Sequence, residues 1–253
     1  MLTVSDTAYS ISAIRALESE KPAAERIFDD PYAHVFAAAG AHAAEGTKRF
    51  LSLPFFRDAI RLRVRGIDDF VRDGLTAGLT QIVLMGAGFD TRGMRIAEIA
   101  RAGARVFEVD FPVVLDKKRA ILENAAIAVP EHIVSVPCDF SDEFESTLVP
   151  ALEKHGFRAG AGAIFVWEGV IAYIDQQAID RCLRFMARAG GPGSRLAVEY
   201  WAESFAPEGP LERMRKMGFT RLEETSFDSL WRRHLPGDPH ENAAMMRLGV
   251  AFV

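Results

Sequence analysis

The sequence has few of the features that mark secreted, disulfide-bonded or membrane-spanning proteins. Its 253 residues include only two cysteines, Cys138 and Cys182, too few for a disulfide framework and without the spacing of metal ligands. No run approaches the roughly 20 apolar residues that a membrane-spanning helix needs. The first residues also lack the basic region and apolar run of a secretory signal. These absences predict a soluble, cytoplasmic protein with no metal and no membrane partner.

An excess of positive charge is also missing. The 30 lysines and arginines are outnumbered by 35 acidic residues, giving a formal net charge of -5. Nucleic-acid-binding proteins usually carry a basic excess or stripe, so no nucleic-acid partner is expected. Hydrophobic residues make up 49% of the chain, which is enough for a sizeable core.

The pattern of apolar residues changes near residue 80. Residues 5–80 have helical spacing, whereas the rest of the chain alternates short apolar runs with amphipathic stretches. We therefore expect a helical cap at 1–80 and a core at 81–253, in which doubly wound α/β topology places helices on both faces of a mostly parallel, seven-stranded sheet. The expected strands lie at 81–85, 105–110, 133–137, 163–167, 195–200, 219–224 and 246–252.

Glycines and acids follow these strands at the positions where open α/β sheets bind ligands. Gly86-Ala87-Gly88 comes directly after the first strand, and its glycines allow a tight turn and a close approach of ligand to backbone. A tight strand–helix turn without a ligand would look the same. Asp110 ends the second strand, where a carboxylate can accept hydrogen bonds from ribose hydroxyls, although a surface acid is the alternative.

Three more strand ends carry candidate residues. Asp139 and Phe140 follow the third strand and could contact the edge and face of an adenine ring, although Asp139 could instead cap a helix. Glu168 and Gly169 follow the fourth strand. The segment 199–201 ends the fifth strand, on the side where a substrate is expected.

The glycine turn distinguishes between two kinds of nucleotide cofactor. A dinucleotide-binding Gly-x-Gly-x-x-Gly motif requires a third glycine where this chain has Thr91. S-adenosylmethionine has no pyrophosphate to place on the helix N-terminus and tolerates that loss. The turn therefore favours a methyl donor over a nicotinamide cofactor.

Longer segments make a family resemblance specific. The runs 81–92 (QIVLMGAGFDTR) and 107–112 (FEVDFP), together with 26–32 (RIFDDPY), 63–67 (RVRGI) and 167–173 (WEGVIAY), resemble the leucine carboxyl methyltransferase family. That family also contains bacterial O-methyltransferases of secondary metabolism. The resemblance extends from residue 12 to about residue 200 and implies a Rossmann-like class I methyltransferase that converts S-adenosylmethionine to S-adenosylhomocysteine.

The resemblance also implies roles for individual residues. Arg63 would pair with the carboxylate of the cofactor's methionine part, and Glu168 would lie near its amino group. A family lysine in the N-terminal segment corresponds to either Lys21 or Arg15. The whole set expected to contact the cofactor is Arg63, Gly86, Ala87, Gly88, Asp110, Phe111, Asp139, Phe140, Glu168 and Gly169.

The methyl acceptor is less well defined by the sequence. The tail after residue 200 is shorter than in family members that act on proteins, so a small molecule or short peptide with a carboxylate or hydroxyl is expected. A hydroxyl needs a general base, for which His234, His240, Tyr173 and Tyr200 are candidates, with solvated or core positions as alternatives. A catalytically silent regulatory protein and a nicotinamide-dependent oxidoreductase are the competing functions.

Overall fold

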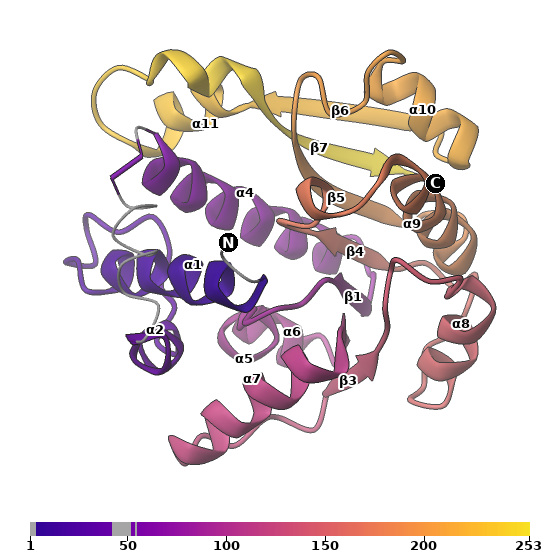
Figure 1. The fold of residues 1–253 in the computed structure, drawn as a ribbon, viewed down its shortest axis with the longest axis horizontal. Coiled ribbons are helices and arrows are strands. Elements are labelled where there is room, and N and C mark those ends of the chain that lie inside the picture. The colour runs from indigo at the N-terminus through magenta and orange to yellow at the C-terminus, as the bar shows by residue number, and fades with distance from the viewer. Residues whose placement is uncertain (1–3, 42–51, 54) are drawn as a thin grey trace.

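The structure, a computed structural model, describes residues 4–41, 52–53 and 55–253. The described residues before the first strand are largely helical, as the sequence predicts. They include the helices α1 (Val4–Ser19), α2 (Ala33–Ala39) and α4 (Phe56–Thr76). Helix α4 packs on the sheet through β4 and β5 and also contacts α1, so it joins α1 to the rest of the molecule (Figure 1).

A single seven-stranded sheet forms the centre of the chain. Its strands are β1 (Gln81–Met85), β2 (Arg105–Asp110), β3 (Ile133–Pro137), β4 (Ile164–Trp167), β5 (Arg195–Trp201), β6 (Arg221–Ser226) and β7 (Met246–Phe252). The spatial order is β3-β2-β1-β4-β5-β7-β6. The first five strands pair in parallel, and β7 runs antiparallel to β5 and β6. This topology confirms the predicted α/β fold.

Helices cover both faces of the sheet. These are α5 (Arg92–Arg95), α6 (Ala97–Arg101), α7 (Pro112–Asn124), α8 (Glu145–Glu153), α9 (Gln176–Gly190), α10 (Pro210–Met217) and α11 (Phe227–His234), with short 3-10 turns η2 (Ile171–Tyr173) and η3 (Glu241–Met245). One apolar cluster joins α4, α6 and α11 to one face, and another joins α8, α9 and α10 to the other. Strand β1 is buried at all five positions, which explains its continuous apolar sequence.

One predicted helix is interrupted. The sequence predicts a helix over 91–102, but Ile96 has an extended backbone (φ -85°, ψ 95°) and divides the segment into α5 and α6. The Ile96 side chain is only 2% exposed and joins the core beneath α4. Burial of Ile96 therefore outweighs local helix propensity, and the short α5 holds Arg92 and Arg95 beside the end of β1.

Candidate functional site

A cavity of about 800 Å³ opens at the carboxyl ends of β1, β2, β4 and β5. Helices α1 and α4 contribute the opposite wall through residues such as Ile11 and Ile60. The volume lies within the range of small-molecule sites, and its position follows the rule for open parallel sheets. All of the residues that the sequence predicts to contact a cofactor line this cavity except Asp139.

The glycine turn after β1 is fixed by backbone hydrogen bonds. The amides of Gly86 and Ala87 donate to the carbonyl oxygen of Val109 at 2.8 and 3.1 Å. Gly86 has φ +78°, and a Cβ there would lie 2.4 Å from Cγ2 of Val170. Glycine is thus required both by the backbone conformation and by a side chain across the cavity.

Asp110 connects this turn to the end of β2. Its Oδ2 accepts a hydrogen bond from the Gly88 amide at 2.6 Å, and its Oδ1 accepts one from the Phe111 amide at 2.7 Å. Burial raises the pKa of Asp110, although the two amides partly offset that effect. The carboxylate lines the cavity and keeps further lone pairs for a ligand. Asp110 therefore shapes the turn and presents an acceptor at the same time.

Arg63 reaches the cavity from α4 and joins two acids at strand ends. Its Nε donates to Glu168 at 2.7 Å, and its Nη1 donates to Glu199 at 3.2 Å. Burial alone would raise the pKa of Glu168, but Arg92 and Arg63 together hold it at about 2. Glu168 is therefore a carboxylate at neutral pH. It presents negative charge where the resemblance expects a methionine amino group.

Arg92 is the buried centre of an ionic cluster beneath this wall. Its Nη1 contacts Glu168 and Asp90 at 2.6 and 2.5 Å, and its Nε donates to Asp68 at 2.8 Å. Asp68 also binds Arg95 at 2.6 and 2.7 Å. Asp90, Arg92 and Glu168 lie within the motifs that carry the family resemblance, whereas Asp68 and Arg95 lie outside them. Most of these pairings join segments that are distant in the sequence.

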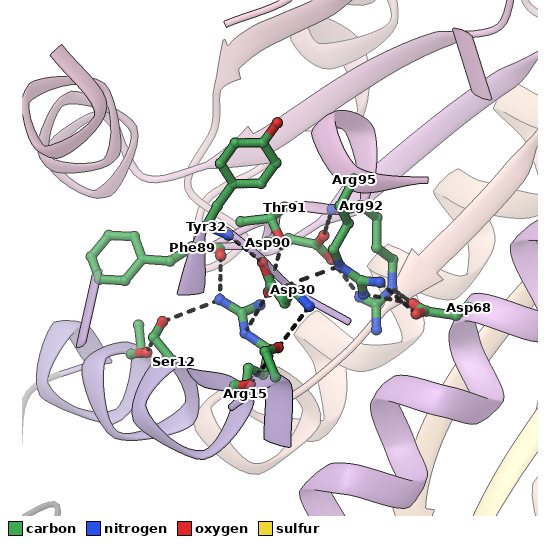
Figure 2. A network of polar contacts seen from close by, with 12 residues as sticks. Ser12, Arg15, Asp30, Tyr32, Asp68, Phe89, Asp90, Thr91, Arg92 and Arg95 are labelled. Atoms are coloured by element: carbon green, nitrogen blue, oxygen red, sulfur yellow. Dashed lines mark hydrogen bonds and ion pairs between the residues drawn. The ribbon is translucent and has the colours of Figure 1, made fainter. Parts of the chain in front are cut away.

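The cluster continues to the N-terminal helix, as Figure 2 shows. Arg15 donates to the carbonyl oxygen of Phe89 at 2.6 Å and lies 3.3 Å from Asp30, which also accepts a hydrogen bond from Thr91 at 2.7 Å. Arg15 lines the cavity. Lys21 instead pairs with Glu18 at 2.5 Å and does not line the cavity. Of the two candidates for the family lysine, the structure therefore brings Arg15 to the site.

Of the two predicted residues that follow β3, Phe140 faces the cavity and Asp139 does not. Phe140 lines the cavity and is 5% exposed. The Asp139 side chain turns to accept a hydrogen bond from the Ser141 amide at 2.8 Å and is not part of the cavity lining. The alternative of a helix cap is not observed either, because α8 begins at Glu145.

Glu199 belongs to the segment 199–201, which the sequence places on the substrate side without a role for the individual residue. Its Oε1 accepts from the Gly169 amide at 2.7 Å as well as from Arg63. Its Oε2 is buried and has no hydrogen-bond partner among the described residues. Burial raises the pKa of Glu199 to about 7, with Arg63 opposing and Glu168 reinforcing that shift. Its place at the end of β5 was the available signal.

The histidine candidates for a general base lie outside the cavity lining. His240 accepts from the Asn242 amide at 3.1 Å and stacks on Phe55, with ring centroids 5.6 Å apart. His234 ends α11, and burial lowers its pKa. The structure therefore places neither imidazole in the lining of the candidate site.

The two tyrosine candidates do line the cavity. The Tyr200 hydroxyl donates to Glu224 at 2.7 Å, and burial together with this bond raises its pKa. A raised pKa makes Tyr200 a poor base at neutral pH. Tyr173 is 54% exposed, at the rim of the cavity.

Two kinds of feature were not found within the described ranges. No group of three or more histidine, cysteine or acidic side chains there could hold a metal ion. None of the helices described is long and apolar enough to cross a membrane.

Comparisons with known proteins agree with this geometry. A model of the leucine carboxyl methyltransferase family matches residues 8–187. A Frankia alni protein named as an S-adenosyl-L-methionine-dependent methyltransferase is 34% identical over 204 residues, covering 79% of this chain and 69% of that protein. A Streptomyces coelicolor protein with the same kind of name is 30% identical over 243 residues, covering 92% and 78%.

Two solved structures have the same fold. A DUF574 family protein from Streptomyces avermitilis has a TM-score of 0.58 at 17% identity, with 97% of this chain and 96% of that chain covered. A protein described as a methyltransferase from Thermobifida fusca has a TM-score of 0.54 at 16% identity, with 97% and 93% covered.

Proposed function

The chain belongs to the leucine carboxyl methyltransferase family and is an S-adenosylmethionine-dependent methyltransferase, and we propose that it methylates an oxygen atom of a small-molecule or short-peptide acceptor. The family resemblance extends the proposal to secondary metabolism. One observation carries the assignment of the site. Acidic side chains at the carboxyl ends of β2, β4 and β5, namely Asp110, Glu168 and Glu199, line one cavity. The glycine turn after β1 lies at the same edge and donates a hydrogen bond to Asp110.

The residues present fit the cofactor. Asp110 would accept hydrogen bonds from the ribose hydroxyls, and Phe140 would pack on the adenine ring. Glu168 would accept from the ammonium of the methionine part. Arg63 and Arg15 would hold its carboxylate, because a guanidinium has donors left after one or two protein contacts. Asp139 has no part in this proposal, since its carboxylate holds a turn outside the cavity lining.

S-adenosylmethionine supplies a methyl group already activated by a positively charged sulfur. The protein's contribution is therefore mainly to hold the two reactants in line at close distance and to exclude water. The cap helices contribute to this through the residues of α1 and α4 that line the cavity, such as Ile11 and Ile60. We propose that residues 1–80 act as a cap on a core formed by residues 81–253.

Binding and transfer can be tested separately. Isothermal titration calorimetry should show micromolar binding of S-adenosylmethionine and S-adenosylhomocysteine and no comparable binding of NAD. The absence of binding by either sulfur compound would refute the proposal. A protein that binds both but never transfers a labelled methyl group would instead be the silent regulatory alternative.

Asp110→Ala is the sharpest variant for the cofactor site. It removes an acceptor from a buried site, so we expect affinity for S-adenosylhomocysteine to fall about 10- to 100-fold, corresponding to about 1–3 kcal/mol. Asp116→Ala is the matched control, because Asp116 is exposed on α7 and pairs with Arg119 on the surface. Equal affinities of the two variants would contradict the assigned role of Asp110.

A further inference from the structure

The carboxyl ends of the strands form an ordered row. The sheet order β3-β2-β1-β4-β5 places the candidate contacts along one edge in the sequence Phe140, Asp110, Gly86, Glu168 and Glu199. If adenine lies near Phe140 and the methionine part near Glu168, as the proposed function requires, the remaining space is beside β5. Glu199 therefore lies where the cofactor ends and the acceptor begins.

The two carboxylate oxygens of Glu199 differ in their hydrogen bonding. Its Oε1 accepts two hydrogen bonds, from Gly169 and Arg63, whereas its Oε2 is buried and without a partner among the described residues. The side chain is 9% exposed and lines the cavity. A buried carboxylate oxygen without a donor is unfavourable unless a ligand supplies one. The carboxylate of Glu199 therefore has lone pairs left for a hydroxyl or other N–H or O–H donor on a ligand.

The charges of the cavity disfavour an anionic acceptor. Within the described part of the chain, the lining contains four carboxylates and two cationic side chains, Arg15 and Arg63. Arg15 already binds the carbonyl oxygen of Phe89 and lies beside Asp30, and Arg63 binds two glutamates. Because the proposed function assigns the remaining donors of Arg15 and Arg63 to the carboxylate of the methionine part, a carboxylate acceptor would enter a net acidic cavity with no further cationic side chain in its described lining, at a desolvation cost.

The wall beyond Glu199 is largely apolar. Trp201 and Met246, which pair between β5 and β7, line the cavity together with Phe55, and Tyr200 has its hydroxyl directed to Glu224. Ser204 and Asn242 add two polar side chains to the lining. Such a surface binds a hydrophobic or aromatic skeleton, while the few polar groups orient it. An apolar skeleton would contact this wall while one polar group meets Glu199, whose Oε2 has no donor in the described part of the chain.

We infer that the acceptor is an uncharged, apolar molecule carrying a hydroxyl group, and that Oε2 of Glu199 accepts the hydroxyl proton during methyl transfer. This inference rests on the proposed function. The hydroxyl oxygen forms a bond to the methyl carbon, the carbon–sulfur bond breaks with its electron pair going to sulfur, and the proton passes to Glu199. The products are a methyl ether, a neutral thioether and a protonated Glu199.

The surroundings of Glu199 suit this role at neutral pH. The charged groups that face it are Arg63 from α4 and Glu168, which directly follows β4, and its register partner on β7 is Leu248. Burial raises the pKa of Glu199 to about 7, which matches the range in which a general base works best. Glu168, beside it, has a pKa of about 2 and stays ionised, so the two neighbouring acids have different roles.

A binding experiment tests the inference without turnover. The protein loaded with S-adenosylhomocysteine is titrated at pH 8 with 2-naphthol and with 2-naphthoate, which share one skeleton. We expect wild type to bind 2-naphthol at least about tenfold more tightly, and Glu199→Gln to reduce that preference to about threefold or less. Glu203→Gln, the same change on an exposed residue outside the cavity lining, should behave as wild type.

Kinetics test the proton transfer. With a naphthol-type acceptor, the rate should rise with pH through a single ionisation near 7. In Glu199→Gln the rate should be roughly 10²- to 10⁴-fold lower and lack that rise, while affinity for S-adenosylhomocysteine changes less than about threefold. The ether product should survive mild alkali, which hydrolyses a methyl ester.

The outcomes separate the two proposals. Failure of wild type to bind either sulfur compound refutes the proposed function itself. If the cofactor binds, the inference is overturned by any of four results: 2-naphthoate binding at least as tightly as 2-naphthol, no binding of either, an alkali-labile product, or full activity of Glu199→Gln.

Discussion

Arg92 is predicted to be the most important single side chain for the stability of the site. It is 3% exposed and its guanidinium contacts Asp68, Asp90 and Glu168. Replacement by methionine preserves length and apolar packing but leaves these carboxylates with fewer partners. Breaking a buried ion pair from one side costs about 3–5 kcal/mol.

The remaining contacts place Arg92→Met near the lower end of that range. Asp68 keeps Arg95, and Glu168 keeps Arg63. We therefore expect a loss of about 3 kcal/mol, which for a chain of this size lowers Tm by about 6–12 °C. Thermal unfolding followed by circular dichroism or calorimetry measures this change, provided that unfolding is reversible.

Arg72→Met is the matched control for Arg92→Met. Arg72 is 40% exposed, and its contacts with Glu98 and Asp69 are 3.5 and 3.7 Å long. Exposed pairs of this kind contribute about 0–1 kcal/mol. A decrease in Tm no greater for Arg92→Met than for Arg72→Met would refute the reasoning about the buried cluster.

The same variant has a second expected effect, on ligand binding. Burial favours protonation of Glu168, and Arg92 is the first of the charges that oppose it. Loss of Arg92 should therefore raise the pKa of Glu168, so that affinity for S-adenosylhomocysteine falls on acidification at a higher pH than in wild type. Calorimetric titrations across pH 4–7 would measure the difference, and identical pH profiles would contradict the role given to Glu168.

Two further predictions concern the glycine turn and the pH dependence of stability. Gly86→Ala should lower the free energy of unfolding by about 2–5 kcal/mol, because Gly86 has a positive φ and an added Cβ would collide with Val170. Gly78→Ala is the control, since Gly78 has a positive φ but open space around it, and it should lose only about 1–2 kcal/mol. Equal losses in chemical denaturation would contradict the steric argument. Glu199 has a folded pKa of about 7 against an ordinary value of 4.5, so its contribution to stability is present below about pH 4.5 and lost as the pH rises through 7. Between pH 5 and 8 the free energy of unfolding of Glu199→Gln should therefore rise relative to that of wild type. The gain is at most about 3 kcal/mol, since each pH unit between the two pKa values corresponds to about 1.4 kcal/mol. A difference in unfolding free energy that stays constant from pH 5 to 8, measured by chemical denaturation, would contradict this prediction.

Much of the site could be predicted because it depends on local sequence. Gly86 and Asp110 immediately follow or end apolar strands, and parallel topology brings all such ends to one edge. Glu168 and Phe140 were found by the same reasoning. Asp139 shows its limit, because strand-end position fixes where a backbone lies but leaves a side chain free to bond its own turn.

Long-range contacts account for what the sequence left undetermined. Nothing in the spacing of Arg15 and Lys21 indicates which one faces the cavity, since both lie on the N-terminal segment. The structure distinguishes them because Glu18 holds Lys21 and the carbonyl oxygen of Phe89 holds Arg15. His234 and His240 likewise could be excluded from the cavity lining only once α11 and η3 were in place.

The sequence by itself determined the alternating α/β fold, the family and the edge of the sheet at which the candidate site lies, because apolar periodicity and strand-end glycines and acids are local features. The tertiary structure alone decided how Arg63 and Arg92 share their carboxylates and which oxygen of Glu199 has no hydrogen-bond donor among the described residues. These properties depend on burial and on partners more than 70 residues apart in the chain, such as Arg63 with Glu168 and Arg92 with Glu168. The free energy of a buried charge is set by its surroundings rather than by its neighbours in sequence.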